Sequence, residues 1–163
     1  MGWDPPTSLT VGGACMACEQ IRIVLSNDLS EIATLHRELE NFGQRCRLSS
    51  KTLFELNLIL EEVLANVISY AYADNLRHEI EVRADSRDGE LVIAVEDDGR
   101  PFNPLQSPPP DLDRPLDQRR VGGLGLHLVR ELTNSIQYDR RGGKNHLLVR
   151  KKIEEGDSRE RGT

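Results

Sequence analysis

A carboxylate and a carboxamide stand four positions apart in the run Glu61-Glu62-Val63-Leu64-Ala65-Asn66. The run lies inside a long amphipathic pattern, and residues four apart share one face of a helix. The carboxylate of Glu62 can take a proton from a hydroxyl or orient a water molecule. The carboxamide oxygen of Asn66 suits Mg²⁺, which binds few protein groups and keeps water and phosphate ligands. Glu61 points about 100° away from Glu62. On this helix alone, a solvated polar face is the simpler interpretation.

Two glycine-bearing loops follow downstream. Asp97-Asp98-Gly99 ends a β-branched run, and a carboxylate there can accept a hydrogen bond from an amino-purine. Gly122-Gly123-Leu124-Gly125 precedes a helical pattern, where glycines let the backbone approach phosphates at a helix N-terminus. Each loop alone is equally explained by an ordinary turn, and the second is neither a Walker loop nor a Rossmann fingerprint. The Glu62–Asn66 pair on the helix and the two glycine loops, taken together and in this order, indicate a nucleotide site.

The spacing of apolar residues predicts the elements that carry these motifs. Helices are predicted over residues 28–46, 50–72 and 123–134. Strands are predicted over residues 21–25, 78–84, 91–95, 136–140 and 146–153. Prolines exclude regular structure from most of the segment 101–121, which we expect to be a long loop. Because the helices do not alternate singly with strands, we expect an α+β fold. This is a two-layer α/β sandwich with a mixed sheet covered on one face by helices.

The composition bounds the class of protein. The length of 163 residues suits one domain, which we expect at residues 20–153, between a flexible leader (1–19) and a disordered charged tail (154–163). The net charge of −6 argues against nucleic-acid binding, and no apolar run suits a membrane helix. No signal peptide is evident, so a cytoplasmic location is expected. Cys15 and Cys18 lack a second ligand pair, which disfavours a zinc or redox site.

Three motifs together resemble those of a known family. Glu62 to Asn66, followed by Tyr70-Ala71-Tyr72, is similar to the N box of the GHKL (Bergerat-fold) ATPase superfamily. The run from Asp97 to Pro104 resembles its first glycine box, and the run from Gly122 to Leu128 resembles its second. Within the superfamily the chain most resembles the anti-sigma factor serine-protein kinases of bacterial partner switching. The resemblance covers about residues 20–153.

The resemblance implies an enzyme that uses ATP and Mg²⁺. It implies that Glu62 is the general base toward a serine or threonine hydroxyl, that Asn66 binds Mg²⁺, and that Asp97 contacts the adenine amino group. The implied nucleotide-contacting positions are Asn66, Asp97, Gly99, Phe102, Gly122, Gly123, Leu124, Gly125 and Leu126. Gly99 would let the chain pass the base, and the later glycines would hold phosphates. Residues 103–121 would be a lid over ATP, from which Arg119 or Arg120 would reach the γ-phosphate.

The resemblance also implies partners. The protein substrate would be an antagonist (anti-anti-sigma) protein with a phosphorylatable serine or threonine. A sigma factor and a second copy of this chain, forming a homodimer, are further partners that the resemblance allows. Neither a nucleic acid nor a membrane is implied.

The chain departs from the family pattern at three places. Tyr70 stands where many relatives have histidine, and Pro101 stands where many have a second glycine. The late Gly-Thr element of the superfamily is represented only by Gly143-Lys144-Asn145.

Two other functions stay open. One is an ATP-binding module that sequesters a regulator without kinase activity. The other is the ATPase domain of a histidine kinase, which shares the same pocket. His36 and Glu38 superficially resemble a phospho-accepting motif. No separate dimerisation helix pair precedes the pocket, so we interpret His36 as a surface residue of the first predicted helix.

Overall fold

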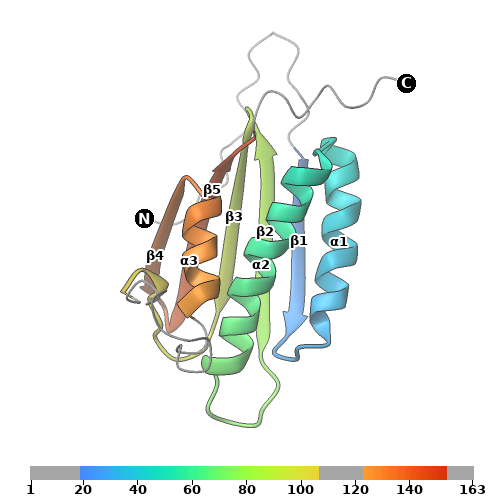
Figure 1. Cartoon of the computed structure of the whole chain (residues 1–163). Coiled ribbons are helices and arrows are strands. Elements are labelled where there is room, and N and C mark those ends of the chain that lie inside the picture. The colour runs from blue at the N-terminus through green and yellow to red at the C-terminus, as the bar shows by residue number, and fades with distance from the viewer. Residues whose placement is uncertain (1–18, 107–122, 154–163) are drawn as a thin grey trace, which may run out of the picture.

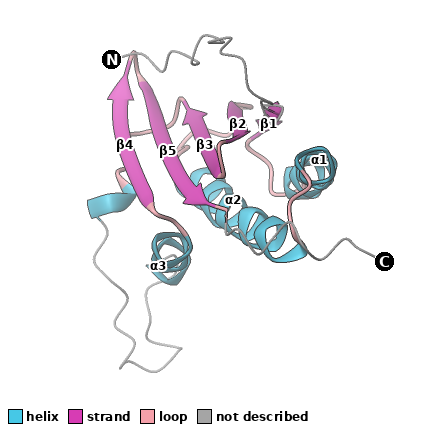
Figure 2. Ribbon diagram, turned by 90° about the horizontal axis from the view of Figure 1, so that it is seen from above, coloured by secondary structure: helices cyan, strands magenta, loops and turns pink. Residues whose placement is uncertain are grey.

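The computed structural model describes residues 19–106 and 123–153. In these residues, three α-helices cover one face of a five-stranded sheet (Figure 1, Figure 2). The elements, in chain order, are β1 (Glu19–Ser26), α1 (Glu31–Cys46), α2 (Ser50–Tyr70), β2 (Glu79–Arg87), β3 (Glu90–Asp97), the 3-10 helix η1 (Pro104–Gln106), α3 (Gly123–Leu132), β4 (Ser135–Arg141) and β5 (Lys144–Lys152). The predicted α+β sandwich with helices on one face is therefore confirmed.

The sheet is antiparallel throughout, and the expected mixed pairing is wrong. The strand order is β1-β2-β3-β5-β4, and all four neighbouring pairs are antiparallel. Tight turns join β2 to β3 and β4 to β5, which makes each pair a hairpin. β3 and β4 each pair antiparallel with β5, so these two strands run parallel to each other. They do not touch, however, because β5 lies between them.

Helix α2 carries the first motif, and it begins after a serine N-cap. The Ser49 side chain accepts a hydrogen bond from the Thr52 backbone N–H at 3.0 Å. Such a cap satisfies one of the donors that a helix start leaves unpaired. The helix ends at Tyr70, two residues before the predicted end.

A buried apolar stripe orients α2 on the sheet. Its buried members are Leu56, Ile59, Leu60, Val63 and Leu64. They pack with the inward residues of the central strands, among them Ile80, Val82, Ile93 and Val95. Burying each large apolar side chain contributes about 1.5–3 kcal/mol, so the stripe holds the rotation of α2. The polar positions Glu62 and Asn66 are thereby left beside the stripe.

Several boundaries differ from those expected. β1 begins at Glu19, a residue that the sequence analysis assigned to the leader. α1 begins at Glu31, because the Asp28 side chain accepts the Ser30 N–H at 2.8 Å and forms a turn before the helix. Within the described residues, no helix combines the length and the apolar character that a membrane crossing requires.

Some predictions lie outside the described residues. They concern the leader and its cysteines Cys15 and Cys18, most of the 103–121 loop with Arg119 and Arg120, Gly122, and the charged tail. The first part of that loop is described, and it forms η1.

Candidate functional site

Four of the predicted site residues, Asn66, Asp97, Phe102 and Leu126, line one cleft. It lies between α2, α3 and the ends of β3, β4 and β5. Its lining consists of Val63, Asn66, Val67, Tyr70, Ala71, Val95, Asp97, Phe102, Pro104, Leu126, Tyr138, Asn145 and Leu147. Apolar walls with a few polar groups are typical of sites for small organic ligands.

Glu62 and Asn66 lie one turn apart on α2, as the spacing predicts. The Asn66 side-chain N–H₂ donates to the Glu62 carbonyl at 2.9 Å, which turns the carboxamide oxygen the other way. Asn66 lines the cleft, whereas the Glu62 side chain extends from α2 to Gly125, near the start of α3. A Cβ added to Gly125 would stand only 1.9 Å from Glu62 Oε2. The carboxylate therefore lies directly against the Gly125 backbone.

The neighbouring Glu61 is not part of this site. It faces α1, where its Oε2 lies 3.1 Å from His36 Nε2. Both side chains are nearly half exposed. The helical separation of the two glutamates is confirmed, and so is the interpretation of His36 as a surface residue.

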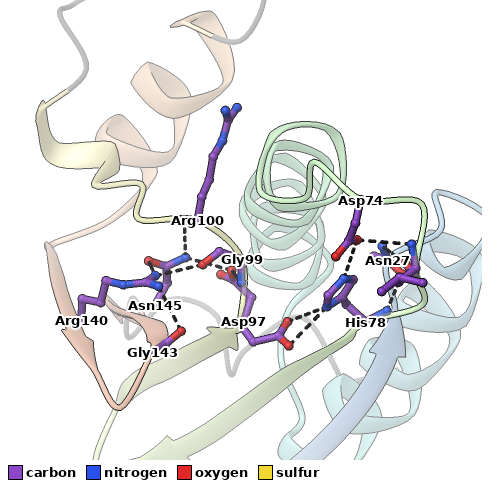
Figure 3. A network of polar contacts seen from close by, with 11 residues as sticks. Asn27, Asp74, His78, Asp97, Gly99, Arg100, Arg140, Gly143 and Asn145 are labelled. Carbon is purple, nitrogen blue, oxygen red and sulfur yellow. Dashed lines mark hydrogen bonds and ion pairs between the residues drawn. The ribbon is translucent and has the colours of Figure 1, made fainter.

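Asp97 lies at the inner end of the cleft and is 5% exposed. Its Oδ1 accepts two hydrogen bonds, from the Gly99 N–H at 2.9 Å and from Asn145 Nδ2 at 2.9 Å (Figure 3). Burial raises the pKa of Asp97 above its usual range, while the bonds from Asn145 and Gly99 act against that rise. The geometry suits a carboxylate that accepts one further hydrogen bond from a ligand.

Gly99 is glycine for a reason that the sequence did not indicate. A Cβ there would stand 2.4 Å from the Ala71 Cβ and 2.9 Å from the Ala71 carbonyl oxygen. The Arg100 N–H also donates to that carbonyl at 2.9 Å. The turn after β3 is therefore pressed against the end of α2, and a side chain at position 99 has no room.

The second glycine box is described only in part. Gly123 is the first residue of α3, and Leu124 follows within the helix. Leu126 is buried and lines the cleft. Phe102, in the loop after β3, also lines the cleft and is 38% exposed. Arg130 of α3 donates to the Pro104 carbonyl at 2.8 Å, which ties η1 to the helix.

Sequence reasoning missed the contribution of the β4–β5 hairpin. Asn145 is buried beside Asp97, and Tyr138 and Arg140 both donate to its side-chain oxygen. The only sequence signal was Gly143-Lys144-Asn145, noted as a departure from the Gly-Thr element. That signal does not indicate which strand lies beside Asp97.

His78 was also missed. Its Nε2 lies 2.7 Å from Asp74 (Figure 3). Its Nδ1 lies 3.2 Å from Asp98, and its ring stacks on that of Tyr72. The hydrogen bonds to Asp74 and then Asp98 raise the pKa of His78. This histidine therefore links the loop after α2 to the turn that carries Asp97.

The donor set fits a nucleotide with its cation better than an isolated metal. Among the described residues, no cluster of three or more histidine, cysteine or acidic side chains could hold a metal ion. Asn66 offers a single oxygen, so Mg²⁺ at this place would take its other ligands from phosphates and water. The apolar walls and the Asp97 carboxylate fit an amino-purine.

Comparison with known proteins agrees with this geometry. A family model described as the histidine kinase-like ATPase domain matches residues 25–151. The serine/threonine-protein kinase BtrW of Bordetella bronchiseptica is 34% identical over 111 residues, which cover 68% of this chain and 78% of BtrW. The serine-protein kinase RsbW of Oceanobacillus iheyensis is 24% identical over 109 residues, which cover 64% of this chain and 69% of that protein.

One solved structure shows the same fold. The RsbU and RsbW domains of Rv1364c from Mycobacterium tuberculosis match with a TM-score of 0.61 at 14% sequence identity. The match covers 83% of this chain and 32% of that longer chain, and at this identity it bears on the fold alone.

Proposed function

The chain belongs to the histidine kinase-like ATPase family, and we propose that it is a Mg·ATP-dependent serine/threonine-protein kinase of the anti-sigma type. The observation that carries the proposal is the placement of Glu62 and Asn66 beside a cleft that has Asp97 at its inner end. In this proposal Glu62 would be the general base, Asn66 would be the cation ligand, and Asp97 would be the carboxylate that recognises the nucleobase. The kinase names of BtrW and RsbW support the same activity.

The nucleotide would lie along the cleft. Asp97 would accept a hydrogen bond from the adenine amino group, and Phe102 and Leu126 would contact the purine ring. Backbone N–H groups from Gly122 to Gly125 would bind phosphates at the start of α3, where the helix dipole favours negative charge. Asn66 would hold the Mg²⁺ that neutralises those phosphates.

The reaction would use Glu62 as a proton acceptor. ATP supplies the γ-phosphoryl group. As the serine oxygen of the substrate forms its bond to the γ-phosphorus, the bond to the leaving ADP oxygen breaks, and the hydroxyl proton passes to Glu62. Most of the rate enhancement in such transfers comes from positioning and charge neutralisation.

The partners follow from the same proposal. The substrate would be an antagonist protein with a phosphorylatable serine or threonine, and a sigma factor is the further partner of this class of kinase. We also propose a cytoplasmic location and a homodimer.

Phosphotransfer can be tested with adjacent glutamates as matched variants. The chain is incubated with Mg·ATP and an antagonist-type substrate, and phosphoserine is measured by mass spectrometry. Glu62→Ala should lower the rate by about 10²–10⁴-fold, the range for loss of a general base. Glu61→Ala removes a carboxylate that faces His36 instead, and it should leave the rate unchanged.

One outcome would contradict the role of Glu62, and two would contradict the kinase activity itself. Phosphotransfer that persists in Glu62→Ala would show that Glu62 is not the general base. Tight ATP binding without transfer would indicate a sequestration module. Phosphate on His36 would indicate a histidine kinase.

A further inference from the structure

Three polar side chains on neighbouring strands stand in one row at the inner end of the cleft. Asn145 of β5 is the register partner of Asp97 on β3 and of Arg140 on β4. Directly opposed residues on antiparallel strands hold their side chains about 5 Å apart on one face. The row therefore runs from the cleft, through Asn145, to Arg140 at the edge strand (Figure 3).

The Asn145 side chain has no capacity left for a ligand. Its Nδ2 donates to Asp97 Oδ1 and to the Arg100 carbonyl, both at 2.9 Å. Its Oδ1 accepts from the Tyr138 hydroxyl at 2.7 Å and from Arg140 Nη1 at 2.8 Å. A carboxamide has two hydrogens to donate and two lone pairs to accept with, and all four are used. Asn145 can act on a nucleotide only through Asp97.

Arg140 determines which way the Asn145 amide points. A guanidinium can only donate, so the group that faces Arg140 must be the amide oxygen. The amide N–H₂ is then forced toward Asp97. Arg140 is itself held, because Nη1 also donates to the Gly99 carbonyl at 2.9 Å and Nη2 donates to the Gly143 carbonyl at 3.1 Å.

This chain of bonds fixes how Asp97 presents its oxygens. Oδ1 already accepts from Asn145 and from the Gly99 N–H, so Oδ2 is the oxygen that is left to meet a ligand. The two donors and the Arg140 charge favour the ionised carboxyl against the effect of burial. An ionised carboxylate only accepts, so it attracts an amino group and repels a carbonyl oxygen.

We propose that Arg140 and Asn145 form a positioning relay that keeps Asp97 ionised and oriented, and that this relay sets the preference of the cleft for an amino-purine. The inference rests on the proposed nucleotide site and deepens it. Arg140 and Asn145 are positioning residues, since neither has to touch the nucleotide.

Two measurements on the whole chain test the relay. The first is the titration of the Asp97 carboxyl by carbon-13 NMR without nucleotide. The second is calorimetric binding of Mg·ATP and of Mg·ITP, in which a carbonyl replaces the amino group. Arg140→Gln should raise the Asp97 pKa, weaken ATP binding about tenfold and bring the affinities for ATP and ITP closer together. Arg140→Lys keeps the positive charge but lacks the planar guanidinium. Its Asp97 pKa and its ATP affinity should lie between those of the wild type and of Arg140→Gln.

The adjacent arginine provides the matched control. Arg141 lies next on β4 and pairs with Asp139, so Arg141→Gln should change neither measurement. An Asp97 pKa that is the same in Arg140→Gln and in the wild type would overturn the relay. So would an equal loss of ATP and ITP affinity, which is the mark of a merely structural role. A wild type that binds no ATP would contradict the proposed function instead, and the titration would still decide the relay.

Discussion

At the Asp97 end of the cleft, side chains from different strands are hydrogen-bonded to one another. At the Glu62 end, the hydrogen bond of the Asn66 side chain stays within its own helix. Asp97, Asn145 and Arg140 share a continuous set of hydrogen bonds that reaches three strands. Within the described part of the chain, the bond that joins Glu62 and Asn66 is internal to α2. The Glu62 carboxylate lies against the backbone of Gly125.

In the proposed function, this difference would separate nucleotide recognition from phosphotransfer. A carboxylate that must select one nucleobase, as proposed for Asp97, gains from a fixed orientation, because reorganisation on binding would lower the affinity. A general base such as the proposed Glu62 must reach a hydroxyl of a second protein. The phosphates and that protein substrate would complete its geometry. We therefore expect substitutions at the Glu62 end to lower the rate, and those at the Asp97 end to lower affinity and stability.

Gly125→Ala should have the largest effect of these and act on the rate. The new methyl group would overlap Glu62 Oε2, so the carboxylate must move away from α3. Misplacing a catalytic group by about 1 Å can cost about 10²-fold in rate. Alanine is a better helix former than glycine by about 1 kcal/mol, so the melting temperature should not fall. Single-turnover phosphotransfer and thermal unfolding, measured on the same sample, check both expectations.

Gly43→Ala is the control for that variant. It also adds a methyl group inside a helix, but the added Cβ would meet the flexible Leu53 side chain at 2.9 Å, away from the cleft. The rate should be that of the wild type. A Gly125→Ala enzyme with a normal rate would show that Glu62 needs no confinement at this end.

Gly99→Ala should act on stability and affinity. Its methyl group would overlap Ala71, including the backbone carbonyl, and backbone yields less readily than a side-chain tip. Such overpacking typically costs about 1–3 kcal/mol of unfolding free energy, and ATP affinity should fall with it. Urea unfolding compared with Gly43→Ala gives the measurement. Equal destabilisation in the two variants would show that the turn after β3 is not specially constrained.

His78→Gln should have the smallest effect, visible only as a pH dependence. The folded-state pKa of His78 is raised above 6.5 by Asp74 and Asp98, with the ring packed on Tyr72. A raised pKa stabilises the fold fully below about pH 6.5, and this contribution is lost as the pH rises through the folded-state value. The wild type should therefore lose more stability than His78→Gln between about pH 6 and about pH 9.

The reference for that comparison is the wild type, measured over the same pH range. If the stability of His78→Gln follows that of the wild type over this pH range, the contacts of His78 with Asp74 and Asp98 contribute nothing measurable to the free energy of unfolding.

The predictable part of the site comes from local periodicity. Glu62 and Asn66 are four apart on a helix, and Glu61 is turned away to His36, so one helical wheel separates the site from the surface. Asp97 and Gly99 could be found because a strand pattern ends in a recognisable turn. The strand pairing was not predictable in the same way, because an alternating pattern does not say which strand lies beside which.

The sequence alone determined the helices and strands, the helical face that carries Glu62 and Asn66, the turn at Gly99 and the start of α3 at Gly123. These are short-range features, since spacing and turn chemistry act over a few residues. Only the tertiary structure decided that Asn145 and Arg140 stand beside Asp97, and that Ala71 fills the space above Gly99. The insertion of β5 between β3 and β4 brings residues about 45 positions apart into one row, and such contacts arise from packing of the whole sheet.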